Sequence, residues 1–337
     1  MLKEAVAKIT ERIDLTQEEA LDAMNEIMGG QAQESLIAGF LVGLRLKGET
    51  PEEIAGCALS MRQNATMIKS NRDNVIDTCG TGGDSSGTFN VSTTAAIMAS
   101  AVGVPVAKHG NKAVSSVCGS ADVLRTLGVN IEMDPDRAAR VLNEVGITFL
   151  FAPRFHGAMK YAAEIRKQLG IRTVFNILGP LTNPAGATRQ VVGVFSPRLT
   201  QTMASVLKLL KCDHALVVHG EGGFDEFSTL GVSSVSELQA GSVRNFSMHV
   251  SETGLPTGKR EEVTGGDANA NAAIIRRILD GVTGAPCDLA LLNAGAAVYV
   301  GGKADSIWEG VKIAREVLLS GRAKKKLLDW VEASHSM

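Results

Sequence analysis

The chain has 337 residues, of which 45% are hydrophobic and 21% charged, and its formal net charge is −2. This balance is typical of a globular protein and excludes the disordered and fibrous classes, and the length suits one large domain or two unequal ones, of which we favour two. The near-neutral charge creates no global field for a polyanion, so a nucleic-acid partner is disfavoured and any phosphate chemistry must be local.

The cysteines and the first residues indicate the compartment. The five cysteines are an odd number, are widely scattered and include no CxxC pair of the kind that zinc and redox sites use. We interpret them as reduced thiols of a cytoplasmic protein. The first twenty residues form a charged amphipathic helix pattern without the apolar core of a signal peptide, and no stretch approaches the length of a membrane span. The sequence therefore predicts no contact with a membrane.

Residues 1 to about 70 show only helical patterns. Apolar residues recur at helical spacing between residues 2 and 13. A second helix is predicted from the capping box of Thr16 and Glu19 to Gly29. A third is expected over 36–46, and the run TPEE at residues 50–53 opens a fourth that reaches about residue 67.

From residue 74 onward short β-branched runs alternate with helical stretches, which indicates a parallel sheet flanked by helices. Strands are predicted over 75–78, 104–107, 148–151, 191–195 and 215–218. The last hundred residues are helix-rich, with helices expected over 271–279, 289–299 and 304–319. The predicted fold class is α/β, with a mostly parallel central sheet flanked by helices and a smaller all-helical N-terminal domain.

The domain boundaries follow from the same patterns. Residues 1–70 form the helical domain, and residues 73–154 and 186–337 form the α/β domain. A helical segment after residue 155 does not fit as a crossover between strands. We expect the helices of about 155–185 to join the helical domain.

The strongest chemical motif is a strand, a glycine-dense turn and a helix start. Gly80, Gly82 and Gly83 let the backbone approach an anion closely, and Ser92 and Thr93 add hydroxyl donors at the helix entry. A lone GxGG is as consistent with a structural turn, but the flanking strand and helix favour phosphate binding. The segment lacks the third glycine of GxGxxG and the lysine of GxxxxGK[ST], so dinucleotide and P-loop chemistry are disfavoured.

A second polar loop follows the next predicted strand and begins at Lys108. In a doubly wound sheet ligands bind outside the carboxyl ends of the strands, so both loops should face one crevice. Surface exposure is the alternative for Lys108, but its position just after a buried strand favours a phosphate contact at the mouth of the loop. His109 is equally consistent with a loop histidine that has no acid or base role.

Two further features carry charge. Asp225 and Glu226 sit in a glycine-rich loop after an apolar strand, where both carboxylates can turn toward Mg²⁺, although a solvated acidic pair is the usual state of such residues. Arg166 lies in a predicted helix and could be only a surface arginine. A guanidinium is, however, the group best suited to hold a carboxylate in a fixed orientation.

Four stretches together resemble the anthranilate phosphoribosyltransferase family. They are GTGGDSSGTFNVST at 80–93, KHGNKAVSSVCGSADVL at 108–124, RKQLGIRTVFNILGPLTNPAG at 166–186 and FDEFS at 224–228. The resemblance runs in register over nearly the whole chain, and four long motifs in order are far more specific than one glycine loop. It implies a helical domain with an α/β domain, and a homodimer as the working unit.

The resemblance also implies a reaction and a set of site residues. Phosphoribosyl pyrophosphate (PRPP) and anthranilate would give N-(5-phosphoribosyl)anthranilate and pyrophosphate, a step of tryptophan biosynthesis that uses Mg²⁺. The residues implied for PRPP are Gly80, Gly83, Asp84, Thr88, Asn90, Val91, Ser92, Thr93, Lys108, His109, Gly110, Asn111, Lys112, Ser115, Ser116 and Ser120. Those implied for anthranilate are Gly80, Asn111 and Arg166, and those for Mg²⁺ are Ser92, Asp225 and Glu226.

One departure and two alternatives remain. Lys112 stands where many relatives have arginine, which keeps the charge but loses the planar fork, so its phosphate contact is open. A pyrimidine-nucleoside phosphorylase has the same domain layout, but KHGN and FDEFS argue against it. A nucleic-acid-binding member of the fold group needs a basic face, which the near-neutral charge disfavours. The aromatic amine is neutral at physiological pH, and no residue is assigned as acid or base.

Overall fold

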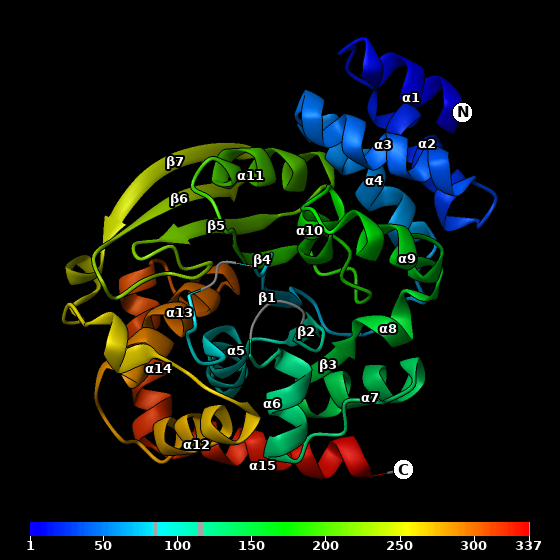
Figure 1. Cartoon of the computed structure of the whole chain (residues 1–337). Helices are drawn as coiled ribbons and strands as arrows, with labels where there is room; N and C mark the ends of the chain where they lie inside the picture. The colour runs from blue at the N-terminus through cyan, green and yellow to red at the C-terminus, as the bar shows by residue number, and fades with distance from the viewer. Residues whose placement is uncertain (84–85, 114–116, 337) are drawn as a thin grey trace.

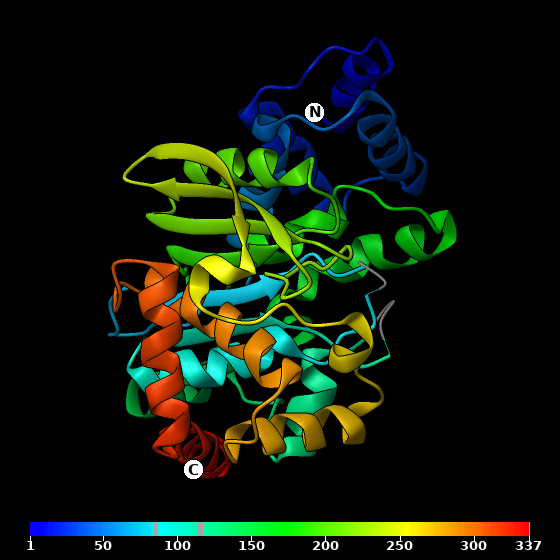
Figure 2. The same ribbon diagram turned by 90° about the vertical axis from the view of Figure 1, so that its left-hand side faces the viewer.

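The computed structural model of the chain describes residues 1–83, 86–113 and 117–336. An α/β body is built on a seven-stranded sheet, and a bundle of helices stands at one end of it (Figure 1). Helices cover both faces of the sheet, and the C-terminal helix lies at the end of the molecule opposite the bundle (Figure 2). In the part of the chain that is described, no helix combines the length and apolar character that crossing a membrane requires.

The bundle is formed by the first helices of the chain. They are α1 (Leu2–Thr10), α2 (Gln17–Met28), α3 (Glu34–Lys47) and α4 (Pro51–Gln63). α1 packs on α3, and α2 packs on α4. All were expected, but α1 ends before Ile13, whose side chain is half exposed, and α4 ends short of residue 67.

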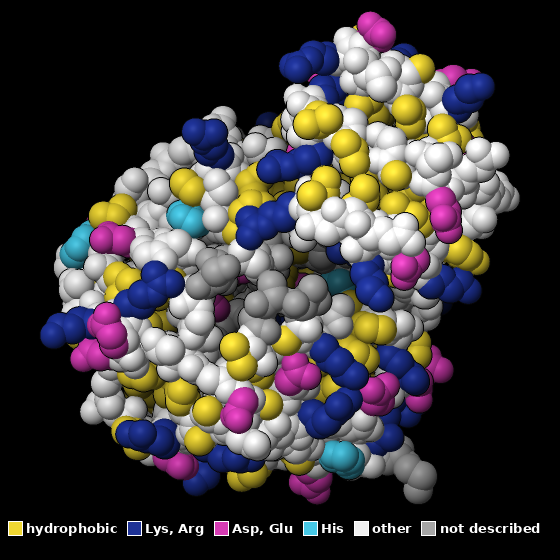
Figure 3. Space-filling view, viewed as in Figure 1, with side chains coloured by type: hydrophobic (Ala, Val, Ile, Leu, Met, Phe, Trp, Pro, Cys, Tyr) yellow, Lys and Arg dark blue, Asp and Glu magenta, His cyan; other side chains and the backbone are white. Residues whose placement is uncertain are grey.

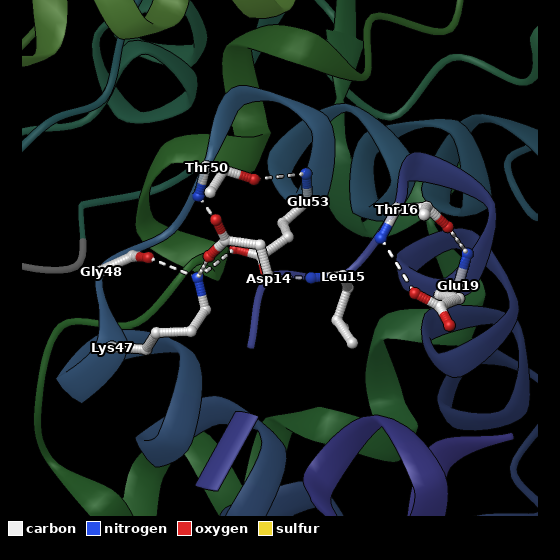
Figure 4. Close-up of polar contacts among 8 residues, drawn as sticks. All are labelled: Asp14, Leu15, Thr16, Glu19, Lys47, Gly48, Thr50 and Glu53. Carbon is white, nitrogen blue, oxygen red and sulfur yellow. Dashed lines mark hydrogen bonds and ion pairs between the residues drawn. The ribbon is translucent and has the colours of Figure 1, made fainter. Parts of the chain in front are cut away.

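Two capping boxes start helices of the bundle, as their sequences indicate (Figure 4). At α2 the Thr16 hydroxyl accepts from the Glu19 N–H at 3.1 Å, and the Glu19 carboxylate accepts from the Thr16 N–H at 3.0 Å. At α4 the same pair of bonds joins Thr50 and Glu53, at 3.3 and 2.9 Å. Each box satisfies backbone donors that the first helical turn leaves unpaired.

Glu53 differs from Glu19 because its side chain is fully buried. It also accepts from the Leu15 N–H at 2.9 Å and lies 3.0 Å from the Lys47 ammonium, which contacts Asp14 at 2.6 Å (Figure 4). A buried carboxylate is tolerated only when its oxygens are paired in this way. Glu53 therefore fixes the α1–α2 connection against the start of α4.

The sheet has the strand order β3-β2-β1-β4-β5-β6-β7. Its strands are β1 (Ile76–Gly80), β2 (Val106–Gly110), β3 (Ile147–Phe151), β4 (Arg189–Gly193), β5 (His214–Gly220), β6 (Val232–Gln239) and β7 (Ser242–His249). β1 to β5 pair in parallel, and β6 and β7 continue the sheet as an antiparallel hairpin. The mostly parallel sheet and the five predicted strands are confirmed, with ends shifted by a few residues, whereas β6 and β7 were not expected.

The remaining helices cover the sheet. They are α5 (Val91–Val102), α6 (Ser120–Leu127), α7 (Pro135–Val145), α8 (Ala152–Phe155), α9 (Lys160–Leu169), α10 (Phe175–Leu178), α11 (Leu199–Leu209), α12 (Ala268–Leu279), α13 (Ala285–Val300), α14 (Ile307–Leu319) and α15 (Arg322–His335). Short 3-10 turns are η1 (Gly157–Met159), η2 (Gly179–Leu181), η3 (Val250–Thr253) and η4 (Arg260–Val263). α13 packs against both α5 and α14. The contact of α13 with α14 is close because glycines meet there: a Cβ on Gly310 would lie 2.2 Å from the carbonyl oxygen of Gly295.

Neighbouring residues of the central strands enter two different hydrophobic clusters. Val191 of β4 belongs to the cluster that contains α5 and α13, and Val192 belongs to the cluster that contains the bundle and α11. Such alternation follows from the two-residue period of a strand. α9 packs against α2 and α3 of the bundle. The bundle thus shares its core with one face of the sheet.

Candidate active site

A cavity opens where the carboxyl ends of β1, β4 and β5 meet the amino end of α5. Its volume is about 260 Å³, including solvent at its mouth. Its lining residues are Thr78, Cys79, Ser92, Ala95, Val191, Gly193, Val218, Asp225, Glu226 and Asn293. The chain runs from β1 to β2 on one side and returns as β4 on the other, so the cavity lies at the switch point where α/β sheets bind ligands.

The glycine loop after β1 touches the acidic loop after β5. The Gly82 N–H donates to the Asp225 carboxylate at 2.9 Å. A Cβ on Gly80 would lie 2.3 Å from an Asp225 carboxylate oxygen, and one on Gly193 would lie 1.3 Å from the Asp225 carbonyl oxygen. Side chains at either position would force the loops apart. Gly80 therefore has a packing reason to be glycine, apart from any contact with substrate.

The acidic loop is held from several sides. The Thr88 hydroxyl lies 3.4 Å from the Glu226 carboxylate and 3.1 Å from the Ser86 hydroxyl. Asn293 of α13, which is buried, accepts from the Phe227 N–H at 3.0 Å and donates to the Phe227 carbonyl at 2.9 Å. Because a buried amide is costly to leave unpaired, these bonds fix the loop backbone next to Asp225.

The three residues predicted to hold Mg²⁺ line this one cavity. Ser92, Asp225 and Glu226 offer only oxygen atoms, the donor type that Mg²⁺ prefers. Among the described residues no group of three or more His, Cys, Asp or Glu side chains could hold a metal by itself. Mg²⁺ commonly binds through one or two carboxylates and takes its other ligands from substrate and water.

The entry of α5 faces the same region. Asn90 precedes the helix but makes no side-chain cap bond. Its amide instead donates to the Cys118 carbonyl at 3.2 Å and accepts from the Asn271 amide at 3.0 Å. The Val91 N–H donates to the Phe89 carbonyl at 2.7 Å, and the amino end of α5 carries the positive end of the helix dipole, which favours an anion. Val91 and Thr93 are fully buried, and the Thr93 hydroxyl has no hydrogen-bond partner among the described residues.

Lys108 lies inside β2 and not at an exposed mouth. Its side chain is 2% exposed, and its ammonium donates to the Thr78 carbonyl and, at 3.2 Å, to the Ser92 hydroxyl. Burial lowers the pKa of Lys108, while the carboxylates of Asp77, Glu226 and Asp225 oppose the shift. Lys108 therefore contacts Thr78 and Ser92, which both line the cavity, and a contact of Lys108 with phosphate stays a prediction.

Asp77 of β1 is a buried acid that the sequence did not suggest as part of the site. Burial raises its pKa, against the effects of Lys108 and of a 2.7 Å hydrogen bond from the Asn183 amide. It also accepts from the His109 N–H at 3.2 Å, and Asn183 donates to the Ala107 carbonyl at 2.7 Å. This network fixes β2 beside β1. An acid inside an apolar strand was the signal that could have revealed it.

His109 packs against a second buried histidine. Its ring centroid lies 5.0 Å from that of His156, and its Nδ1 lies 3.2 Å from the Gly179 carbonyl oxygen. Burial, with a smaller effect of the neighbouring ring, lowers the pKa of His109 to about 3, and burial lowers that of His156 to about 4. Both rings are therefore neutral at physiological pH.

The loop after β2 carries the other predicted contacts. Asn111 and Lys112 are exposed, and the Lys112 ammonium lies 5.7 Å above the Phe151 ring. Ser120 opens α6, and a Cβ on Gly110 would lie 2.2 Å from its hydroxyl. Asp84, Ser115 and Ser116, also predicted to bind PRPP, lie outside the described residues.

Arg166 does not line the cavity. It lies on α9, and its guanidinium stands 4.9 Å from the Phe175 ring. Burial lowers its pKa, although an arginine remains charged at physiological pH. The predicted anthranilate contact therefore sits on the bundle side of the site.

Two arginines at the glycine loop were not among the predicted residues. Arg172 donates to the Gly83 carbonyl, and Arg260 donates to the Ser86 carbonyl at 3.1 Å. Both are exposed and come from segments far from the loop in sequence, so no local pattern marked them. Lys and Arg side chains gather on this face where the bundle meets the α/β body (Figure 3).

Comparison with known proteins identifies the family. A family described as "Glycosyl transferase family, a/b domain" matches residues 72–324, and one described as "Glycosyl transferase family, helical bundle domain" matches residues 3–65. The anthranilate phosphoribosyltransferase of Acetivibrio thermocellus is 50% identical over 336 residues, which cover 100% of this chain and 97% of that protein.

Solved structures agree with the sequence relatives. The crystal structure of anthranilate phosphoribosyltransferase from Thermus thermophilus is 46% identical, with a TM-score of 0.94 over 98% of this chain and 99% of that one. The enzyme from Saccharomyces cerevisiae in complex with PRPP and Mg is 28% identical, with a TM-score of 0.91 over 100% and 98% of the two chains. Another structure of the yeast enzyme holds 4-fluoroanthranilate. This chain therefore belongs to the anthranilate phosphoribosyltransferase family.

Proposed function

We propose that this protein transfers the phosphoribosyl group of PRPP to the amine of anthranilate and so acts as a pentosyltransferase of tryptophan biosynthesis. One observation carries the proposal: the end of β1, the entry of α5 and the acidic loop line a single cavity at the switch point of the sheet, and the glycine loop contacts the acidic loop through the Gly82 N–H. Backbone donors for an anion and carboxylates for a cation are needed side by side to bind a metal diphosphate. The yeast relative that holds PRPP and Mg supports this assignment.

The carboxylates of Asp225 and Glu226, with the Ser92 hydroxyl, are the residues proposed to hold Mg²⁺. When bound, the ion neutralises charge that grows on the departing pyrophosphate. The backbone N–H groups of the glycine loop and of α5 would act on the same charge, because they are fixed before the reaction begins. The Lys108 ammonium donates to the Ser92 hydroxyl at 3.2 Å and adds positive potential to the site.

The reaction forms a carbon–nitrogen bond at the ribose carbon and breaks the carbon–oxygen bond to pyrophosphate, which leaves with the electron pair. The proton lost by the amine passes to solvent or to the departing pyrophosphate. Asn111 and Arg166 are proposed to hold anthranilate, with the Arg166 guanidinium on its carboxylate, and Gly80 is proposed as a further contact. Such positioning makes a bimolecular step effectively unimolecular.

The direct test is an assay of purified protein with both substrates. We expect release of pyrophosphate and formation of N-(5-phosphoribosyl)anthranilate, lost in a chelator and restored by added Mg²⁺. Calorimetry with saturating Mg²⁺ should detect binding of PRPP. No heat of binding and no pyrophosphate release would overturn the proposal.

The acidic loop has its own test. Asp225→Asn combined with Glu226→Gln should suppress turnover at ordinary Mg²⁺ because the carboxylate charges are lost while the shapes remain. Asp213→Asn, an exposed acid before β5, is the control and should leave turnover unchanged. Equal turnover of the double variant and the control would refute the metal assignment.

We also propose that the working unit is a homodimer of the cytoplasm. The bundle exposes apolar side chains, with Leu46 75% and Ile13 51% exposed, which offers area for a second copy. The five cysteines are free thiols, as a reducing compartment keeps them. Light scattering of the purified protein measures the mass, and a monomer at micromolar concentration would exclude a stable dimer.

The division into domains is likewise a proposal. We assign residues 1–70, joined by 155–185, to a helical domain, and residues 73–154 and 186–337 to the α/β domain. The packing of α9 on α2 and α3 supports the assignment of the middle segment. Hydrogen exchange that protects the two sets of residues as separate units would test it.

A further inference from the structure

Two arginines from distant segments of the chain donate to backbone carbonyls of the glycine loop. Arg172, in the connection from α9 to α10, donates to the carbonyl of Gly83. Arg260, at the start of η4, donates to the carbonyl of Ser86 at 3.1 Å. The two carbonyls belong to the described residues on either side of 84–85, and the arginines are 88 positions apart in the sequence.

Each arginine also contacts a second segment of the chain, that of Phe195 for Arg172 and that of Gly222 for Arg260. The Arg172 guanidinium stacks 4.1 Å from the centroid of Phe195, whose N–H donates to the Thr81 hydroxyl at 3.2 Å. A Cβ on Gly83 would lie 3.2 Å from the Arg172 guanidinium, so glycine allows the close approach. Arg172 therefore ties the loop to the segment that follows β4.

Arg260 ties the loop to the acidic loop. Besides Ser86, it donates to the Gly222 carbonyl at 3.2 Å. The segment after Arg260 continues the contact, because the Gly265 N–H donates to the Gly87 carbonyl at 2.8 Å. A planar guanidinium can serve two carbonyls at once, which a single ammonium does less well.

These contacts matter for an anion site because of peptide geometry. In a trans peptide the carbonyl and the N–H of one plane point in opposite directions. A loop that offers N–H groups to a phosphate must therefore keep its carbonyls turned away. The Ser86 carbonyl shares its peptide with the Gly87 N–H, so a charged donor on that carbonyl makes the stronger kind of hydrogen bond and disfavours the flipped peptide.

We propose that Arg172 and Arg260 form a two-arginine clamp that positions the glycine loop for the phosphates of the donor. Neither residue needs to touch the substrate, so both are positioning residues. Arg260 also sets the distance between the glycine loop and the acidic loop, and so links donor binding to the Mg²⁺ requirement. The inference rests on the proposed function and deepens it.

The test compares Arg172→Gln and Arg260→Gln with a matched control. Arg276→Gln serves as control, because Arg276 is an exposed arginine that donates to a backbone carbonyl, that of Thr126, at 2.9 Å. Each clamp variant should raise KM for PRPP by about ten-fold, the effect of losing one charge-assisted hydrogen bond. KM for anthranilate and the melting temperature should stay near those of the control. Arg260→Gln should also raise the Mg²⁺ concentration needed for half-maximal rate.

Two further variants test whether the geometry of the guanidinium groups, and not only their positive charge, positions the glycine loop. Arg260→Lys keeps the charge but not the fork, so most of the loss in PRPP binding should remain. In Arg172→Gln/Arg260→Gln the rise in KM should be smaller than the product of the single effects, because both residues hold one loop.

Several results would overturn the clamp. One is a KM for PRPP in Arg260→Lys that equals the wild-type value. Another is a rise in KM in the double variant that equals the product of the two single rises. The third is a KM for PRPP in both single variants that stays within two-fold of the control. If a variant is too unstable for kinetics, calorimetric titration with PRPP and Mg²⁺ below its melting temperature measures the same loss of affinity. Wild-type protein in the same assay tests the transferase activity separately, since failure of the clamp leaves that activity intact.

Discussion

At the scale of single residues, the site depends on close backbone approach as much as on charged groups. Gly193 ends β4, and the carbonyl of Asp225 passes where its Cβ would stand. No motif marks this glycine, because its constraint comes from a loop that follows another strand. Gly80 lies against the side-chain carboxylate of the same Asp225 and was singled out only because it belongs to a glycine-dense run.

Gly193→Ala should therefore damage the site. A Cβ 1.3 Å from a backbone oxygen must displace the acidic loop, and overpacking of this kind costs about 1–3 kcal/mol. We expect at least a ten-fold fall in turnover and a higher Mg²⁺ requirement, measured by pyrophosphate release. Gly157→Ala is the control, since a Cβ there meets nothing within 4 Å. Equal activity of the two variants would contradict the role of Gly193.

Arg166 allows a second test at this scale. Arg166→Ala should raise KM for anthranilate about ten-fold, because a charged hydrogen bond to the carboxylate is lost, and should leave KM for PRPP nearly unchanged. Lys167→Ala removes an exposed cation from the next position of α9 and should change neither constant. An unchanged anthranilate KM in Arg166→Ala would remove this residue from the acceptor site.

At the scale of elements, local signals predicted those parts of the chain whose structure is locally determined. The capping boxes at Thr16 and Thr50 start helices where expected, since each box involves residues three apart. β6 was missed because three of its five buried residues are polar or charged, namely Ser233, Ser236 and Glu237. Glu237 of β6 is 3% exposed, and only its partners from β5, β7 and α13 make a buried acid acceptable there.

The two capping boxes give a matched pair of variants. Glu19→Ala should cost about 1 kcal/mol of unfolding free energy, as an exposed cap does. Glu53→Ala should cost about 3 kcal/mol, because it also removes the ion pair of the buried Lys47 side chain and the hydrogen bond from the Leu15 N–H. Urea unfolding measures both. Equal costs would show that burial of Glu53 adds nothing to its cap.

Glu237 predicts a pH dependence of stability. Burial alone raises its pKa, but hydrogen bonds from His214, Tyr299 and Arg244 lower it to about 2. The folded pKa lies below the ordinary value of 4.5, so the contribution is present above pH 4.5 and is lost as pH falls toward 2.

Glu237→Gln tests that contribution. At pH 7 the variant should lose about 2 kcal/mol, the order of a charge-assisted hydrogen bond. Between pH 4.5 and 2 its stability should fall less steeply than that of the wild type, measured by urea unfolding at each pH. Parallel pH profiles of the two proteins would contradict the role of Glu237.

At the scale of the whole molecule, the site forms where β1 and β4 lie side by side although more than a hundred residues separate them. The glycine loop and the entry of α5 belong to the connection that follows β1, whereas the acidic loop follows β5, and the two connections meet only through the strand order. The bundle shares its core with one face of the same sheet, and α9 carries Arg166 between the two.

Joint binding should therefore stabilise the whole fold. PRPP with Mg²⁺ should raise the melting temperature, because a ligand at about one hundred times its Kd adds about 2.7 kcal/mol to the free energy of unfolding. Either component alone should have a smaller effect, and a chelator should abolish the gain. A shift by PRPP that persists in the chelator would exclude a metal-dependent donor site.

The sequence by itself determined the fold class, the bundle, the five parallel strands, the family and the loops that carry the phosphate and acidic motifs. These features depend on periodicity, caps and residue types that act over a few positions, and on motifs long enough to be specific. The tertiary structure alone decided the antiparallel hairpin, the burial of Lys108 and Asp77, and the two arginines on the glycine loop. The physical reason is the same in each case: a buried charge or an outward carbonyl is stable only with a partner, and here the partner comes from a distant segment of the chain.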